Sequence, residues 1–142
     1  MKEFLSQAFT LQRLIKAKET HIQQLHSMRE NVSRGLQTET KIQTSRKQDP
    51  IGELAVKILD SEKECRLQIA EMIRIQNEIK STVENVKKAE YRLILYERYV
   101  NLKNWDNIAE DNHYSVKWVH VLHKRSLEFL EKHTKIHCSS HF

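Results

Sequence analysis

A seven-residue apolar ladder runs through the middle of the chain. None of its rungs is polar: Ile51, Ile58, Cys65, Met72, Ile79, Val86 and Leu93. The companion rung, three or four residues further on, mixes apolar and polar side chains: Leu54, Ala55, Ser61, Gln68, Ile69, Ile75, Val83 and Ala89. Because a repeat of about 3.5 residues keeps a helical stripe facing a partner helix, the ladder predicts a coiled coil. The partner stays open: the first helix in an antiparallel hairpin, a second copy of the chain, or both.

The residues that interrupt helices are scarce. Only 2 Gly and 1 Pro occur in 142 residues, which excludes a loop-rich sandwich or barrel and favours long helices. No apolar run approaches the roughly 18 residues of a membrane span, and residues 1–20 lack a signal-peptide centre, so we expect a cytosolic protein. Cys65 and Cys138 are expected to stay reduced.

Residues 2–33 carry apolar side chains on one helical face, with Lys18 in the stripe: Phe4, Ala8, Leu11, Ile15, Ile22, Leu25, Met28 and Val32. A helix of roughly 45 Å needs a partner helix to bury that face. Residues 33–50 lose the periodicity and form a polar linker, with Asp49 and Pro50 as a cap and first-turn pair for the next helix. We expect residues 1–87 to form a long-helix coiled-coil region with this linker inside it.

Residues 88–132 have a different pattern, that of three helices separated by two short breaks. The first helix covers 91–101, and residues 102–104 interrupt it. Asn104 is the expected N-cap of a short helix over 105–111, with Ile108 and Ala109 facing inward. Residues 111–114 favour a turn, and Ser115 then caps a last helix of about 17 residues. This order is that of a helix-turn-helix unit, and the whole chain is expected to be all-α.

A helical wheel divides the last helix into two faces around Val119. The inward side holds Val116, Leu122, His123, Ser126, Leu127, Phe129 and Leu130. The outward side holds Lys117, Val121, Lys124, Arg125 and Glu128, with His120 at its edge and Trp118 on the flank. A capped helix with basic residues on its outer face suits the major groove of DNA. The candidate DNA-contacting residues are Ser115, Val116, Lys117, Trp118, His120, Val121, Lys124 and Arg125, with Arg98 and Lys103 as further candidates for phosphate.

Charge alone does not decide between DNA binding and an ordinary solvated helix face. The net charge is +5, and residues 88–142 hold nine Lys or Arg against seven Asp or Glu. Such a modest excess is equally ordinary for a Lys-rich coiled coil. Trp118 also has a second interpretation, as a side chain packed against the short helix or the coil.

The segment RLILYERYVNLKNWDNIAEDNHYSVKWVHVLHKRSL resembles the sigma-factor region-4-like helix-turn-helix of phage late transcriptional regulators of the RinA and ArpU kind. The matching residues are Arg98, Tyr99, Trp105, Ile108, Ala109, Tyr114, Ser115, His123 and Arg125. The resemblance implies binding of double-stranded promoter DNA, contact with RNA polymerase and action in the cytoplasm of a bacterial host. Trp118 departs from the pattern, since many such helices carry a small polar residue there.

Two rival functions stay open. In the first, the coil is the working part of a protein-interaction adaptor that binds RNA polymerase or another host protein. In the second, the chain is a phage DNA-packaging recognition subunit, although such subunits tend to carry the DNA-binding module first. A homodimer formed through the coil is expected in the regulator, with two recognition helices about 34 to 36 Å apart.

The sequence offers no catalytic motif and no expected cofactor. It has neither a Gly-rich phosphate loop nor a nucleophile with a paired base at a known spacing, so we expect no enzyme. Residues 133–142 form a tail with four ligand-type side chains, His133, His137, Cys138 and His141. Their spacing is not that of a known zinc finger, so no metal site is assigned.

Overall fold

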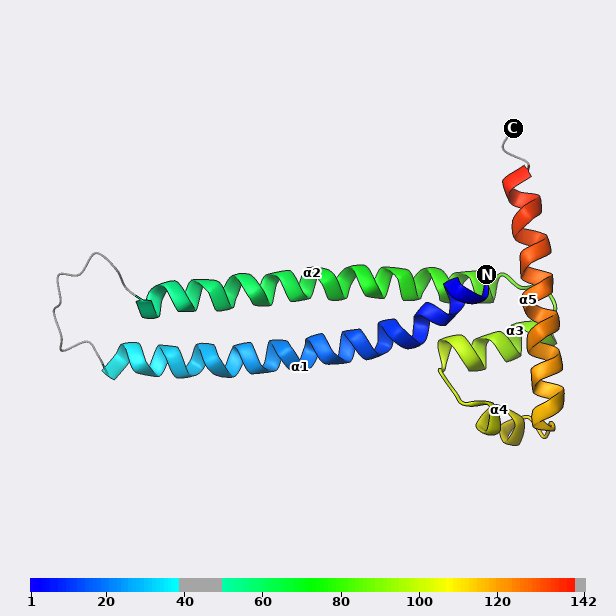
Figure 1. Cartoon of the computed structure of the whole chain (residues 1–142), viewed down its shortest axis with the longest axis horizontal. Helices are drawn as coiled ribbons and strands as arrows, with labels where there is room; N and C mark the ends of the chain where they lie inside the picture. Colours follow the sequence, from blue (N-terminus) through cyan, green and yellow to red (C-terminus); the bar gives the residue numbers. More distant parts are fainter. Residues whose placement is uncertain (39–49, 140–142) are drawn as a thin grey trace. The chain divides into compact units, whose positions relative to one another are not determined.

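The computed structural model describes the backbone of residues 1–38 and 50–139 and the side chains of 1–35 and 50–134, and over this part the chain is helical without strands (Figure 1). The helices are α1 (Lys2–Thr38), α2 (Pro50–Glu84), α3 (Ala89–Leu95), the π-helical turn η1 (Tyr96–Val100), α4 (Trp105–Asp111) and α5 (Val116–Ser139). The expected all-α class is therefore confirmed. None of these described helices is long and apolar enough to cross a membrane.

Residue contacts group the chain into two compact units. Unit 1 consists of Met1–Gln12 and Ile73–Phe142, and unit 2 consists of Arg13–Met72. The first turns of α1 and the end of α2 thus belong with α3, η1, α4 and α5. The units meet between residues 12 and 13 and between residues 72 and 73, whereas the expected boundary lies between residues 87 and 88.

In unit 2, α1 and α2 lie side by side in opposite directions (Figure 1). A late residue of α1 meets an early residue of α2, and the middles of the two helices meet each other: Arg29 donates to Glu62 over 2.9 Å, and Lys18 donates to Gln68. Leu25 of α1 and the ladder residues Ile58 and Cys65 of α2 are buried in this unit. The antiparallel hairpin, one of the partners that the ladder left open, is therefore present within one chain.

The buried side of the hairpin includes an ion pair that the ladder did not predict. Glu62 is only 1% exposed, although it is a carboxylate on the helix face that carries Ile58 and Cys65. Its Oε2 accepts from Arg29, and its Oε1 lies 4.0 Å from His26 Nδ1. The guanidinium of Arg29 therefore supplies the main compensation for a charge buried between two helices.

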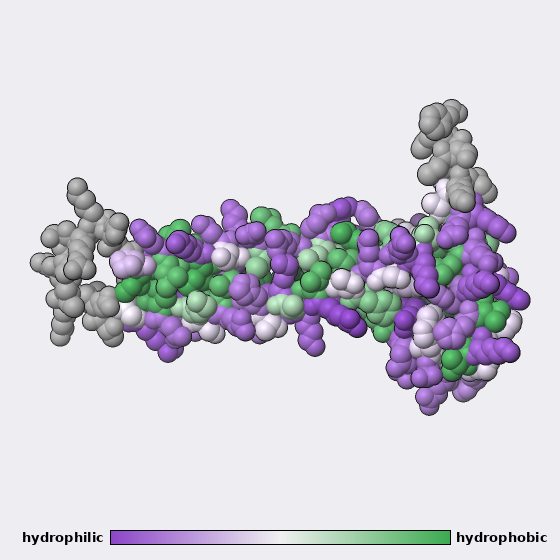
Figure 2. Space-filling view, in the orientation of Figure 1, coloured by the Kyte–Doolittle hydropathy of each residue, from purple (hydrophilic) through white to green (hydrophobic). Residues whose placement is uncertain are grey.

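A two-helix hairpin leaves much apolar surface uncovered. Among the described side chains of unit 2, six large apolar ones are exposed by two fifths or more: Leu14, Met28, Leu54, Val56, Leu59 and Leu67. Figure 2 shows hydrophobic side chains, in green, breaking the hydrophilic surface along the two long helices. Met28 was expected in the buried stripe, and that prediction is wrong, because the seam passes through its neighbours Leu25 and Arg29.

The long helices also differ from the expectation at their ends. α1 continues to Thr38, five residues beyond the expected end, and Pro50 is the first residue of α2 as predicted. Residues 39–49, which include Asp49 and most of the expected linker, lie outside the described residues. The ladder holds as far as Val86, which is buried, but Leu93 is 39% exposed. The last rung is wrong because α2 ends at Glu84, and the new helix α3 starts with a different rotation.

Unit 1 has a compact apolar core. The cluster joins α3, α4 and α5 through Ile94, Ile108, Ala109, Val119 and Leu122, each at most 4% exposed. Three aromatic residues pack around it: Tyr91, Trp105 and Tyr114. The inward positions expected for Ile108 and Ala109 are confirmed. This core fixes α4 and α5 against α3 and so sets the direction in which the outer face of α5 points.

Candidate nucleic-acid interface

The start of α4 is fixed by a side-chain cap. Asn104 has an extended backbone, and its Oδ1 accepts from the amide of Asn107 over 2.8 Å. This bond satisfies one of the free amides of the first turn, which is why the helix begins at Trp105. The predicted cap and the predicted bounds of this helix are both confirmed.

The joint between α4 and α5 is a Schellman turn. The amide of His113 donates to the carbonyl of Glu110 over 3.2 Å, and the amide of Tyr114 donates to that of Ala109 over 2.8 Å. His113 takes the left-handed conformation that closes the turn, with φ of 56°. Tyr114 packs on the core cluster, which supplies the apolar contact typical of this motif. The turn between α4 and α5 is therefore short, and it is fixed by two backbone hydrogen bonds and by the packing of Tyr114 on the core.

Ser115 caps α5 as predicted. Its Oγ accepts from the amide of Trp118 over 3.1 Å, and the helix then runs from Val116 to Ser139, longer than the expected 17 residues or so. Leu122, His123, Ser126 and Leu130 are buried, as the helical wheel requires. Val116 is an exception: it was placed inward and is 38% exposed, because it belongs to the first turn and precedes the buried position of Val119.

The outer face of α5 is exposed and cationic over its first three turns. From Ser115 to Arg125 the chain carries three basic residues, Lys117, Lys124 and Arg125, and no acidic residue. All three are exposed, as is His120, while Val121 is half-buried. Within the described part of the chain, neither Lys117 nor Lys124 has a carboxylate partner. These cations are therefore available to an anionic partner.

Trp118 lies on the flank of this face and is 40% exposed. The guanidinium carbon of Arg125, on the same helix, lies 5.6 Å from the centre of its ring. The ring therefore contacts a basic side chain of the candidate interface and keeps a large apolar area open to solvent.

The two further phosphate candidates have other contacts. Lys103 lies between the carboxylates of Glu97 and Asp111, which raise the pKa of its ammonium group. Its charge is thus already compensated, which makes it a poor phosphate contact. Arg98 lies over the rings of Phe9 and Trp105, 4.4 and 4.2 Å from their centres, and donates to the carbonyl of Lys103 over 2.8 Å. Sequence reasoning missed this arrangement, since Phe9 and Arg98 are far apart along the chain.

A buried histidine anchors α5 to η1. His123 is 7% exposed, and its Nε2 forms a hydrogen bond with the hydroxyl of Tyr99 over 2.7 Å. Burial lowers the pKa of His123 to about 4, and the nearby charges of Lys2, Arg98 and His120 contribute in the same direction. The imidazole is therefore neutral at neutral pH and serves as a hydrogen-bonding core residue.

Of the four ligand-type residues of the tail, the structure describes the side chain of His133. The ring of His133 stacks on that of Phe129, with centres 3.9 Å apart. The side chains of His137, Cys138 and His141 lie outside the described residues. Among the described side chains, no group of three His, Cys, Asp or Glu residues is placed to hold a metal ion.

Comparison of the chain with protein families, with curated proteins and with solved structures gave no match. The candidate interface is accordingly defined by its own geometry. It consists of a capped helix, held by a tight joint and a buried core, with an exposed basic face.

Proposed function

We propose that the chain is a sequence-specific transcription regulator that binds double-stranded DNA through α5. In this proposal α4 and α5 form the helix-turn-helix, and α5 enters the major groove. The observation that carries it is the outer face of α5, where Lys117, His120, Lys124 and Arg125 are exposed around the half-buried Val121, without an acidic residue before Glu128. A protein that neutralises phosphates needs cations that are not already paired within its own fold.

The roles within the interface follow from position along α5. Val116 and Lys117 lie in its first turn, the part of a recognition helix that reaches base edges, and Val121 offers an apolar contact further along. Ser115, the N-cap that precedes this turn, is a candidate to hold phosphate. Lys124 and Arg125 lie later and have the length to reach phosphates. Trp118 and His120 flank the same face and complete the candidate set.

The resemblance to phage late regulators of the RinA and ArpU kind supports the wider part of the proposal. In that setting the protein acts in the cytoplasm of a bacterial host as a homodimer and activates late genes through RNA polymerase. The two exposed apolar side chains beside the basic face, Val116 and Trp118, favour a protein contact there. An adaptor that binds a polymerase subunit with this surface is therefore the second candidate function.

Duplex binding at two salt concentrations tests the proposal. We expect fluorescence anisotropy with a labelled duplex to show tight binding at 50 mM salt and much weaker binding at 200 mM, because phosphate contacts release counterions. Lys124→Ala should weaken binding to every duplex and lower the salt slope by about one, whereas Lys117→Ala or Val121→Ala should alter sequence preference.

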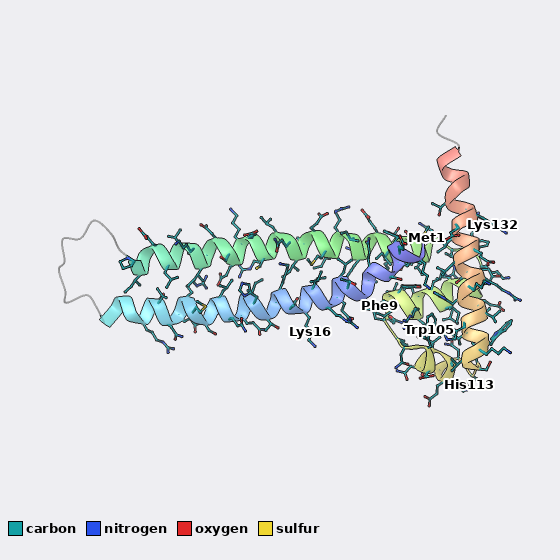
Figure 3. The ribbon with its side chains drawn as sticks, in the orientation of Figure 1. Met1, Phe9, Lys16, Trp105, His113 and Lys132 are labelled. Carbon is teal, nitrogen blue, oxygen red and sulfur yellow. The ribbon has the colours of Figure 1, made fainter. Side chains whose placement is uncertain are left out.

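Lys16→Ala is the matched control, since Lys16 is an exposed lysine of α1 in unit 2 (Figure 3). It should leave the affinity for DNA unchanged. A full chain that fails to bind duplexes at 50 mM salt would contradict the regulator and favour the adaptor. If the full chain does bind duplexes, selection of bound duplexes from a random pool would identify its operator sequence.

A further inference from the structure

Unit 1 contains a hollow of about 320 Å³ between the first turns of α1, η1, α4 and α5. Seven of the side chains that line it are cationic, imidazole or aromatic: Lys2, Phe9, Arg98, Tyr99, Trp105, His120 and His123. Figure 3 labels Phe9 of α1 and Trp105 of α4, whose rings both contact the guanidinium of Arg98. The basic face of α5 described above meets this hollow only at His120.

The hollow gathers positive charge without a compensating acid. None of its lining residues is acidic, and within the described residues neither Lys2 nor Arg98 has a carboxylate partner. The nearest acid along η1, Glu97, is paired with Lys103 instead. Like charges that gather in this way repel one another unless an anion lies between them.

Arg98 is held in place but keeps donors available. Its guanidinium lies over two aromatic rings, which fix the orientation of its plane, and one of its groups donates to the Lys103 carbonyl. A guanidinium has five N–H donors arranged as a fork, so several remain for a ligand. This geometry matches the paired oxygens of a phosphate or a carboxylate better than a single point charge does.

The electrostatics at His123 agree with this description. Lys2, Arg98 and His120 each lower the pKa of the His123 imidazole, in addition to the larger effect of burial. The cations Lys2 and Arg98, from two separate elements, thus impose positive potential on the same point. An anion in the hollow would offset that potential and would be attracted by all three groups.

We propose that this hollow is a binding site for a phosphate-type oxyanion. Arg98 supplies a forked pair of donors, Lys2 supplies a mobile ammonium group, and His120 supplies an imidazole N–H. The volume lies at the lower end of the range for small-molecule sites, which suits inorganic phosphate or a small phosphorylated compound. The inference stands apart from the proposed function, since inorganic phosphate alone can test it.

NMR spectra of the full chain can follow both tryptophan indoles. Inorganic phosphate is titrated at pH 7 against sodium chloride at the same ionic strength. We expect the indole signal of Trp105 to shift with saturation, while that of Trp118, outside the hollow, stays in place. Lys2→Gln should weaken the apparent affinity about fivefold, and Arg98→Lys about tenfold, because lysine keeps the charge but loses the fork.

Lys16→Gln is the control on the same helix and should leave the titration unchanged. Lys2 is exposed in the first turn of α1, so its variant tests the site even if Arg98→Lys does not fold. A duplex titration separates two sources of the oxyanion. If the Trp105 signal shifts when inorganic phosphate is added, the ligand is a free anion. If the Trp105 signal shifts only when duplex is added, and Lys2→Gln weakens that shift, the oxyanion belongs to DNA. The site is disproved if neither titration saturates, or if neither Lys2→Gln nor Arg98→Lys alters the response.

Discussion

The two units of this chain bury their apolar side chains to different extents. Unit 1 contains a cluster from three helices in which Ile94, Ile108 and Val119 are fully buried. Unit 2 pairs only two helices and leaves residues such as Val56 and Leu67 more than half exposed. The difference teaches that a third helix, and not the length of the helices, closes a core. Long α1 and α2 present large apolar faces, but each can cover only one side of the other.

The largest expected effect on stability comes from a change in the closed core of unit 1. Ile94→Ala should lower the free energy of unfolding by about 4 kcal/mol, because it leaves a cavity in a closed core. Leu67→Ala is the matched change in unit 2, and should cost less than about 0.5 kcal/mol because Leu67 is 64% exposed. Both tryptophans lie in unit 1, so fluorescence in urea follows that unit alone, while far-UV circular dichroism follows both. Equal losses for the two variants would contradict the contrast.

The second effect concerns the buried imidazole of unit 1. The folded pKa of His123, about 4, lies below its ordinary value of 6.5, so the unfolded chain binds more protons between those two values. Stability should therefore be complete above about pH 6.5 and fall by roughly 3 kcal/mol as the pH drops to about 4.

The groups that face His123 are Lys2, Arg98, His120 and Tyr99. Urea unfolding followed by tryptophan fluorescence at a series of pH values measures the effect. In His123→Gln that dependence on pH should largely disappear, whereas His21→Gln, at an exposed position of unit 2, should retain it. If both variants keep the same slope, some other group is responsible.

The third effect tests the polar pair of unit 2. Arg29→Met should lower the free energy of unfolding by about 2 kcal/mol. The variant leaves the carboxylate of Glu62 buried, with only the imidazole of His26, 4.0 Å away, beside it. The double variant Arg29→Met with Glu62→Leu should recover most of this loss, since it removes both charges. Circular dichroism in urea is the measurement. Lys80→Met, which breaks the exposed pair with Glu84, should change stability by less than about 0.5 kcal/mol.

The smallest effect is a gain of stability in unit 1. His113→Gly should raise the free energy of unfolding by about 1 kcal/mol, because glycine adopts a φ of 56° without the steric cost that a side chain imposes. Asn112→Gly is the neighbouring control. Asn112 has a negative φ and donates to the Ile108 carbonyl, so its replacement should destabilise the protein instead. A loss in both variants would indicate that the His113 side chain itself is needed.

Sequence patterns predicted best where local chemistry decides the structure. Asn104 and Ser115 were recognised as caps because a side-chain oxygen three residues before a free amide sets the start of a helix by itself. The buried positions of α5 at Leu122, Ser126 and Leu130 followed from helical periodicity in the same way.

The failures have a common physical origin, since they depend on contacts between distant parts of the chain. Counting heptads could not detect that α2 ends at Glu84 and that Leu93 therefore leaves the buried stripe. The burial of Glu62 depends on Arg29 from the other helix. The hollow around Arg98 likewise requires Phe9, a residue outside the predicted stripe of the first helix, so no sequence pattern indicated that it contacts η1. The candidate DNA contacts remain predictions, and what the structure adds is that their side chains are exposed, except for the half-buried Val121.

The thiol of Cys65 has a practical consequence for unit 2. It is free and only 8% exposed, so a bulky thiol reagent can attack it only after α1 and α2 separate locally. In a chain carrying Cys138→Ser, the labelling rate at Cys65 would report how often the hairpin opens. Cys65 therefore serves as a built-in chemical reporter of local opening in unit 2, the unit that buries its apolar side chains less completely.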